Sequence, residues 1–151
     1  MKYTTEIIVE IPRDAFIKKL DSIENFKHWQ RGFIDYEHVS GVPGKIGAQM
    51  KLNYKFGKRR MDLIETITYI DFPNEFHATY NAKGMHNVQN NYFEKISDNH
   101  TKWVSINEFY PTTFAMRMMT LFMPGTFKKQ SKKYLEDFKN FAEKGTSVSH
   151  A

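Results

Sequence analysis

The chain has 151 residues, of which 40% are hydrophobic and 15% aromatic, and its formal net charge is +5. A chain of this size and composition is typical of one ordinary globular domain, and it is too rich in large side chains to be disordered. It contains no cysteine, which excludes disulfides, thiolate nucleophiles and cysteine-bound metals. The small basic excess permits only weak attraction to anionic surfaces.

The sequence shows no targeting or membrane-spanning segment. Its first residues run directly into a strand-like stretch and lack the apolar core and small-residue cleavage site of a signal peptide. No apolar run approaches the roughly 20 residues that a bilayer-spanning helix needs. Together with the absence of cysteine, these features lead us to expect a cytoplasmic protein.

The first part of the chain predicts one strand and two short helices. Residues 4–11 are mostly β-branched and end at Pro12, which is typical of a strand. Asp14 is a candidate cap for a helix that runs to Leu20. A second short helix is expected over residues 23–31, with Ser22 as its candidate cap and Gly32 as its stop.

The middle of the chain alternates with period two, and the end returns to period 3.6. Strands are expected over residues 34–39, 49–56, 59–70, 75–82, 88–96 and 101–110. The pair Gly57-Lys58 suits a tight hairpin turn. A Met-rich helix is expected over residues 114–122 and a longer one over 126–144, with the break at Met123-Pro124-Gly125.

These elements predict an α+β fold, in which a curved antiparallel sheet of six to seven strands surrounds the long C-terminal helix. That helix has one apolar stripe, and only the sheet is available to bury it. The stripe consists of Phe127, Ser131, Tyr134, Phe138 and Phe141. We expect a single domain over residues 1–145 and a frayed tail over 146–151.

Alternation also predicts which strand residues face the helix. In the hairpin, Leu52, Tyr54, Leu63 and Glu65 share the inner face, and Tyr80 joins them from the next strand. For the last two strands the preferred phase puts Gln89, Asn91 and Phe93 inside on one, and Trp103, Ser105, Asn107 and Phe109 inside on the other. The alternative phase puts Val104, Ile106 and Glu108 inside instead.

Five strings carry a resemblance to a known family: HWQRGF at 28–33, GVPGKIGAQMKLNY at 41–54, ETITYID at 65–71, TKWVSINEF at 101–109 and MPGTFKKQSKKYLEDFKNFAEKG at 123–145. The chain resembles the SRPBCC superfamily of START-like, Bet v 1-like and polyketide cyclase/dehydrase-like proteins over nearly its whole length. It is most similar to short, uncharacterised bacterial members.

The resemblance implies a helix-grip fold, in which a seven-stranded antiparallel sheet wraps around the C-terminal helix and two short helices close it. It also implies a cavity between sheet and helix that takes hydrophobic small molecules. It supplies no reaction and no catalytic residue, because carriers, receptors, cyclases and hydrolases share this scaffold.

Glu65 is the strongest candidate for acid–base chemistry. Burial among apolar neighbours would raise its pKa and let it protonate or deprotonate a carbonyl compound, while Tyr54 and Asn91 orient that substrate. The structural interpretation is that Glu65 bonds Asn91, Tyr54 or a buried water, or pairs with Arg59 near the rim. A structural role is favoured for Glu65 and for each inner amide.

The two tryptophans and the Met-rich segment each allow more than one structural interpretation. Trp29 and Trp103 line a pocket or, as we favour, pack the core. The segment from Met116 to Met123 is a buried start to the long helix, a gate that opens at Pro124-Gly125, or a lip that touches a membrane with the lysines beside it.

The leading functional hypothesis is binding of a hydrophobic small molecule, a lipid-like or aromatic metabolite. The alternatives are a cyclase, dehydratase or hydrolase that uses Glu65, and an adaptor that contacts membranes or a protein partner through the Met-rich and Lys-rich region. The candidate pocket residues are Trp29, Tyr54, Leu63, Glu65, Tyr80, Asn91, Trp103, Asn107, Met119, Met123, Phe127 and Tyr134.

We expect no cofactor and no nucleic-acid partner, because the chain lacks the motifs for either. No two histidines lie three or four residues apart, so no metal site is expected. A weak contact with anionic membranes belongs to the third hypothesis, and the chain is expected to be a monomer or a homodimer.

Overall fold

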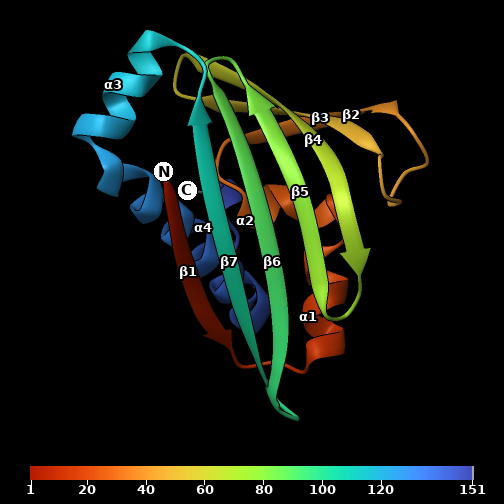
Figure 1. Ribbon diagram of the computed structural model, residues 1–151. Coiled ribbons are helices and arrows are strands. Elements are labelled where there is room, and N and C mark those ends of the chain that lie inside the picture. Colours follow the sequence, from red (N-terminus) through yellow and green to blue (C-terminus); the bar gives the residue numbers. More distant parts are fainter. Residues whose placement is uncertain (151) are drawn as a thin grey trace.

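A computed structural model describes residues 1–150 and shows a curved seven-stranded sheet with helices on its concave side (Figure 1). All neighbouring strands are antiparallel, in the order β1-β7-β6-β5-β4-β3-β2. The strands are β1 (Lys2–Val9), β2 (Phe33–Ser40), β3 (Gln49–Phe56), β4 (Arg59–Asp71), β5 (Glu75–Ala82), β6 (Met85–Ser97) and β7 (His100–Pro111). The predicted sheet-and-helix class is confirmed.

The helices come in two groups, one after β1 and one after β7. They are α1 (Arg13–Leu20), the 3-10 helix η1 (Ile23–Asn25), α2 (Phe26–Trp29), α3 (Phe114–Phe122), α4 (Pro124–Lys144) and the 3-10 helix η2 (Val148–His150). Within residues 1–150 no helix is long and apolar enough to cross a membrane.

Three local expectations are corrected. The second short helix divides into η1 and α2 and already ends at Trp29, and Asp14 lies inside α1 while Pro12 precedes it. Pro124 begins α4, where its missing N–H is harmless, so the break falls at Met123. The tail is not frayed over residues 146–150, because η2 packs beside α2 and Ser147 bonds His28; Ala151 lies outside the described residues.

An aromatic cluster packs α4 against one end of the sheet. Phe138 is fully buried, and its ring centroid lies 4.8 Å from Phe16, 5.2 Å from Trp29 and 5.4 Å from Trp103. Phe93 completes this group, which we call the aromatic cluster. Its rings meet mostly edge to face, an arrangement that adds to the stability gained from burial alone.

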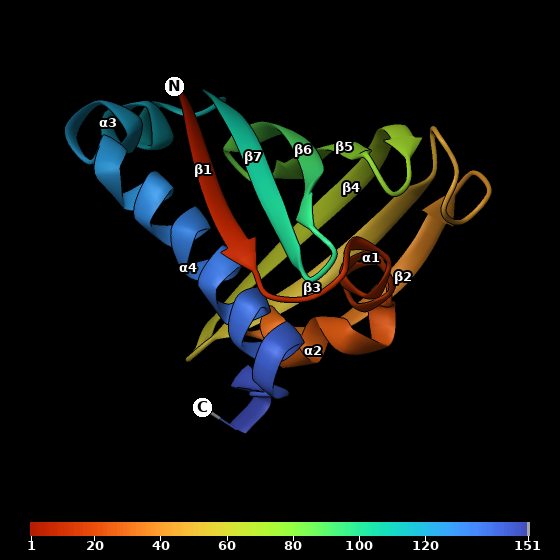
Figure 2. The same cartoon turned by 90° about the horizontal axis from the view of Figure 1, so that it is seen from below.

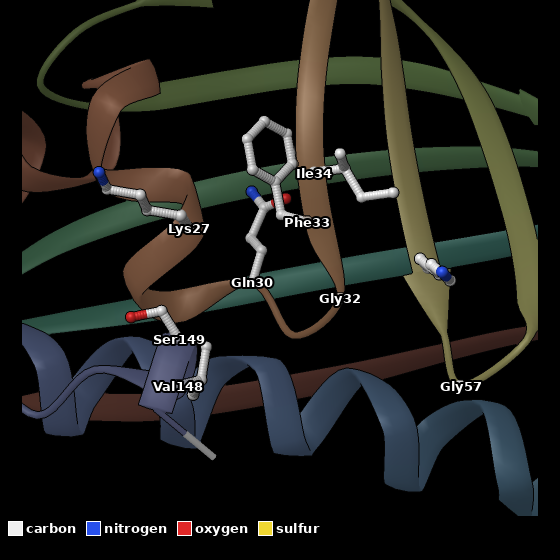
Figure 3. Close-up of a pocket in the computed structure, with 9 residues that line it drawn as sticks. Lys27, Gln30, Gly32, Phe33, Ile34, Gly57, Val148 and Ser149 are labelled. Atoms are coloured by element: carbon white, nitrogen blue, oxygen red, sulfur yellow. The ribbon is translucent and has the colours of Figure 1, made fainter.

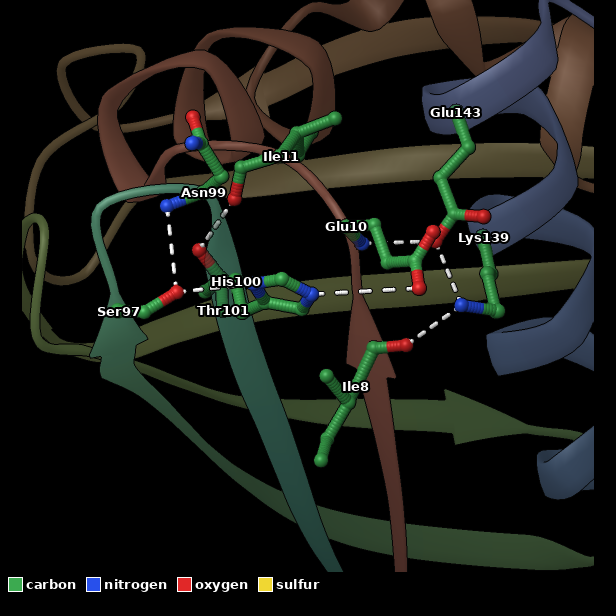
Figure 4. Close-up of polar contacts among 9 residues, drawn as sticks. All are labelled: Ile8, Glu10, Ile11, Ser97, Asn99, His100, Thr101, Lys139 and Glu143. Atoms are coloured by element: carbon green, nitrogen blue, oxygen red, sulfur yellow. Dashed lines mark hydrogen bonds and ion pairs between the residues drawn. The ribbon is translucent and has the colours of Figure 1, made fainter.

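The side of α4 that faces β1 protects the open edge of the sheet. Lys132 Nζ donates to the carbonyl of Glu6 at 2.6 Å, and Lys139 Nζ donates to that of Ile8 at 2.7 Å. Glu143 accepts from the backbone N–H of Glu10 at 2.7 Å (Figure 4). Edge carbonyls and N–H groups satisfied in this way are less available for pairing with another chain.

The phase of the last two strands follows the preferred prediction. Trp103, Ser105 and Asn107 are buried with at most 5% of their surface exposed, whereas Val104 and Ile106 are only half-buried. The cause is the cover on the inner face, where Trp103 packs against Phe16, Trp29 and Phe138 of the helices.

The aromatic cluster predicts a sharp contrast between two phenylalanines. Phe138→Ala is expected to lower the free energy of unfolding by about 3–5 kcal/mol, because it leaves a cavity among four rings. Phe122→Ala, the matched control on α3, removes a side chain that is 75% exposed and should change the stability little. Urea unfolding measures both, and equal losses would contradict the packing described here.

Candidate functional site

The register of the sheet arranges the side chains of its inner face in rows that cross the strands. One row runs from β3 to β7 near the α3 end of the sheet and mixes polar with apolar side chains. It consists of Met50, Glu65, Tyr80, Asn87 and Phe109. Successive rows toward α1 hold Gln89 with Asn107, then Asn91 with Ser105, and finally Phe93 with Trp103 of the aromatic cluster.

Glu65 is a buried carboxyl in the first row, between Met50 and Tyr80. It is 8% exposed, and within the described part of the chain no ion pair includes it. Burial raises the pKa of Glu65, the hydroxyl of Tyr80 opposes part of this rise, and the negative charge of Asp21 adds to it. The expected pairing with Arg59 is absent, because Arg59 lies at the exposed hairpin end.

Two buried tyrosines of the inner face keep their hydroxyls protonated: Tyr80, which is paired with Glu65, and Tyr54, two rows away on β3. Burial raises the pKa of Tyr80 well above its ordinary value, and the negative charge of Glu65 raises it further. Burial likewise raises the pKa of Tyr54, which is 5% exposed. The Tyr54 hydroxyl donates to Gln30 Oε1 at 2.5 Å, so it is directed toward the end of α2.

Four amide side chains form a continuous hydrogen-bonded chain over β6 and β7. Asn87 Nδ2 and Gln89 Nε2 both donate to Asn107 Oδ1, at 3.2 and 3.0 Å. Asn91 Nδ2 donates to Gln89 Oε1 at 3.2 Å, and Trp103 Nε1 donates to Asn91 Oδ1 at 2.9 Å. These bonds satisfy buried polar groups, which supports the structural interpretation of the amides.

Asn91 does not lie beside Glu65, so the two do not hold one substrate between them as we expected. The register places Asn91 opposite Phe76 and Ser105, two rows nearer to α1 than Glu65. Its carbonyl oxygen is already occupied by Trp103.

Both tryptophans belong to the aromatic cluster. Trp29 and Trp103 are 7% and 5% exposed, and their rings meet edge to face at 6.2 Å. Within the described residues the indole Nε1 of Trp29 has no hydrogen-bond partner. Their arrangement supports the packing role over pocket lining.

The remaining candidate residues are spread along α3, α4 and β4. Met119 and Met123 are exposed on α3 and the turn after it, so they do not join the inner face. Phe127 lies half-buried against Phe109, with ring centroids 5.2 Å apart, and Tyr134 is half-buried further along α4. Leu63 faces Leu52 across the hairpin.

Two hollows in the surface are lined by residues other than Glu65. One, of about 430 Å³, lies where α2, the β3–β4 turn and η2 meet (Figure 3); it is lined by Lys27, Gln30, Gly32, Phe33, Ile34, Lys55, Gly57, Val148 and Ser149. The other, of about 540 Å³, lies between β1 and the start of α4. None of the twelve candidate pocket residues lines either hollow.

Sequence reasoning missed two contacts that shape the first hollow and the site beside it. Gln30 lines the hollow and also receives the Tyr54 hydroxyl, so it connects that surface to the inner face. Arg31 Nε donates to the buried Asp137 at 2.8 Å and ties the end of α2 to α4. No local pattern marks either pair, since Arg31 and Asp137 are 106 residues apart.

Metal chemistry finds no support in the side-chain arrangement. In the described part of the chain no group of three or more His, Asp or Glu side chains is placed to hold a metal ion. Acid–base chemistry at Glu65 and hydrogen bonding by Tyr80 and Tyr54 are what the inner face offers.

Comparison with known proteins identifies the fold. No protein-family model and no curated protein matches the chain. A conserved protein from Geobacillus kaustophilus matches with a TM-score of 0.78 at 13% identity, over 94% of this chain and 95% of that chain. The Zhui aromatase/cyclase from Streptomyces sp. R1128 gives 0.71 at 10% identity, over 98% and 99%.

Norcoclaurine synthase from Thalictrum flavum, solved in complex with dopamine and hydroxybenzaldehyde, gives 0.67 at 11% identity, over 93% of this chain and 85% of that chain. At such low identities the similarity concerns the fold alone. The chain therefore has the helix-grip fold that these structures share, in which a curved antiparallel sheet surrounds a long C-terminal helix.

Proposed function

We propose that the protein binds a hydrophobic small molecule between the inner face of the sheet and α4, with Glu65 and Tyr80 contacting the polar group of the ligand. The observation that carries this proposal is the buried carboxyl of Glu65, which lies between Met50 and Tyr80 and has no cationic partner among the described residues. A buried carboxyl costs stability unless it is hydrogen-bonded or neutral. Selection for stability alone would favour an apolar residue between Met50 and Tyr80.

Uneven packing along the inner face supports a binding role at the Glu65 end. In the aromatic cluster, Phe93, Trp103 and Phe138 are at most 5% exposed. Near Glu65, Leu52 and Tyr54 are equally buried, whereas Leu63 and Tyr80 are half-buried and keep part of their surface accessible. The helix α4 runs along β1 (Figure 2).

The chemistry of the row defines the kind of ligand. Tyr80 remains a hydrogen-bond donor at neutral pH, and Glu65 is also a donor below its raised pKa. These groups suit a carbonyl or phenol oxygen. Phe109 and Phe127 offer an apolar wall beside them. An aromatic or lipid-like compound with one such oxygen fits this combination.

A binding experiment on the protein and on a variant that lacks the Tyr80 hydroxyl tests the proposal. The purified protein is examined by native mass spectrometry for retained compounds and by thermal shift with a panel of phenols, aromatic ketones and fatty acids. Tyr80→Phe is expected to weaken the best binder about fivefold, because one hydrogen bond is lost. Tyr36→Phe, on exposed β2, is the control and should leave the affinity unchanged. Absence of any binder, or equal affinity in both variants, would refute the proposal.

The raised pKa of Glu65 favours one second function, acid–base catalysis of a cyclisation, dehydration or hydrolysis. Glu65→Gln keeps the size and a donor, so it is expected to preserve fold and ligand affinity. It should abolish turnover of a carbonyl substrate found among the binders, because the amide cannot exchange a proton. Turnover equal to that of the unchanged protein would remove Glu65 from the mechanism.

The same carboxyl makes stability depend on pH. Between the ordinary pKa of a glutamate and the raised one, the folded protein keeps the proton that the unfolded chain has released, so stability falls as pH rises. Glu65→Gln, which cannot ionise, should therefore gain stability relative to the unchanged protein as the pH rises above the ordinary glutamate pKa of about 4.3. Urea unfolding across this range measures the difference.

The control for this pH series is Glu24→Gln, which changes an exposed carboxyl on η1. Its stability difference from the unchanged protein should stay flat. A flat difference for Glu65→Gln as well would show that Glu65 is not desolvated.

A further inference from the structure

The helix α3 presents an apolar stripe that the described chain leaves largely exposed. Phe114, Met118, Leu121 and Phe122 follow the i, i+4, i+7, i+8 spacing of one helix face. Phe114 and Phe122 are 75% exposed and Leu121 is 66% exposed. Figure 1 shows α3 standing out from the corner of the sheet. The expectation of a buried start to the long helix is therefore wrong.

The opposite face of α3 is held firmly, so the exposed stripe is not the product of a loose segment. Thr113 caps the helix by accepting from the backbone N–H of Met116 at 3.3 Å, and the N–H of Thr112 donates to the carbonyl of Gly84 at 2.8 Å. Met116 packs so closely on the β5–β6 turn that a Cβ at Gly84 would lie 2.9 Å from its Cγ.

All of the net charge of the chain lies around this stripe. Residues 112–135 contain Arg117, Lys128, Lys129, Lys132 and Lys133 and no acidic residue. The whole chain has 22 basic and 17 acidic residues, so the part outside this segment has 17 of each and is neutral. An anionic surface would therefore orient the molecule with α3 and the start of α4 toward it.

Three of these lysines surround the second hollow. Next to the end of α3, it is lined by Lys128, Lys129, Lys132, Gly125, Thr4, Thr5 and Glu6. The carboxylate of Glu6 pairs with Lys102 at 3.4 Å. Lys132 is engaged with the Glu6 carbonyl, whereas Lys128 and Lys129 make no ion pair within the described residues. Two exposed cations beside an open hollow suit the phosphate of a lipid headgroup.

We propose that α3 and the start of α4 dock on an anionic lipid bilayer. The stripe from Phe114 to Phe122 enters the boundary between headgroups and acyl chains, while Arg117, Lys128 and Lys129 stay at headgroup level. Large apolar side chains flanked only by cations match a bilayer with anionic headgroups better than a second copy of the chain, whose same surface would present like charges. This surface is separate from Glu65, so the proposal stands independently of ligand binding.

Vesicle co-sedimentation tests this docking. The full chain is mixed with vesicles of phosphatidylcholine alone or of equal parts phosphatidylcholine and phosphatidylserine, at low and high salt. Binding is expected only with phosphatidylserine, and it should weaken as salt rises. Lys128→Gln with Lys129→Gln should weaken binding about fivefold for each charge. The matched control is the double variant Lys18→Gln with Lys58→Gln, which removes two lysines at exposed sites elsewhere. It should bind the phosphatidylserine vesicles several-fold more tightly than the Lys128→Gln, Lys129→Gln double variant.

A second variant separates the apolar contribution. Leu121→Ser with Phe122→Ser should lose the binding that persists at high salt, and thermal unfolding checks that it remains folded. No binding to phosphatidylserine vesicles, or equal loss in both lysine pairs, overturns the proposal. So does a dimer in analytical ultracentrifugation that the serine variant dissociates, since a second copy would then cover the stripe.

Discussion

The fastening of α4 at one end of the sheet is the contact on which the rest of the structure depends. Phe138 packs among Phe16, Trp29 and Trp103, and lysines of α4 satisfy the open edge of β1. These contacts fix the helix along β1 and close the α1 end of the inner face. Because the helix is secured there, the rows at the other end need not be filled by packed apolar side chains.

The rows at the end of the inner face away from α1 contain polar side chains. Glu65 and Tyr80 share a row with Asn87, and the amide chain beside them is satisfied by its own hydrogen bonds. At the same end, Phe109 of this row packs against Phe127 of α4, the helix that follows α3.

Local sequence patterns predicted most of the fold and part of the site. The alternation that places Leu52 and Tyr54 inward also places Glu65 inward, because a period of two leaves only one choice once the apolar face is known. Contacts between distant segments left no such signal: neither the Tyr54–Gln30 bond nor the Arg31–Asp137 pair follows from spacing. The sequence around Trp29 and Trp103 does not distinguish core packing from lining a pocket. Likewise, the apolar pattern of α3 is the same for a buried and an exposed helix, and only the position of the helix after β7 determines which of the two it is.

Direct titration of the Glu65 carboxyl by carbon-13 nuclear magnetic resonance tests the central claim, which is that the inner face holds a desolvated carboxyl suited to a ligand. The account predicts a midpoint above the ordinary glutamate value of about 4.3. It also predicts a further rise in Tyr80→Phe, because the hydroxyl that stabilises the carboxylate is lost. A midpoint at the ordinary value, unchanged in Tyr80→Phe, would contradict the account.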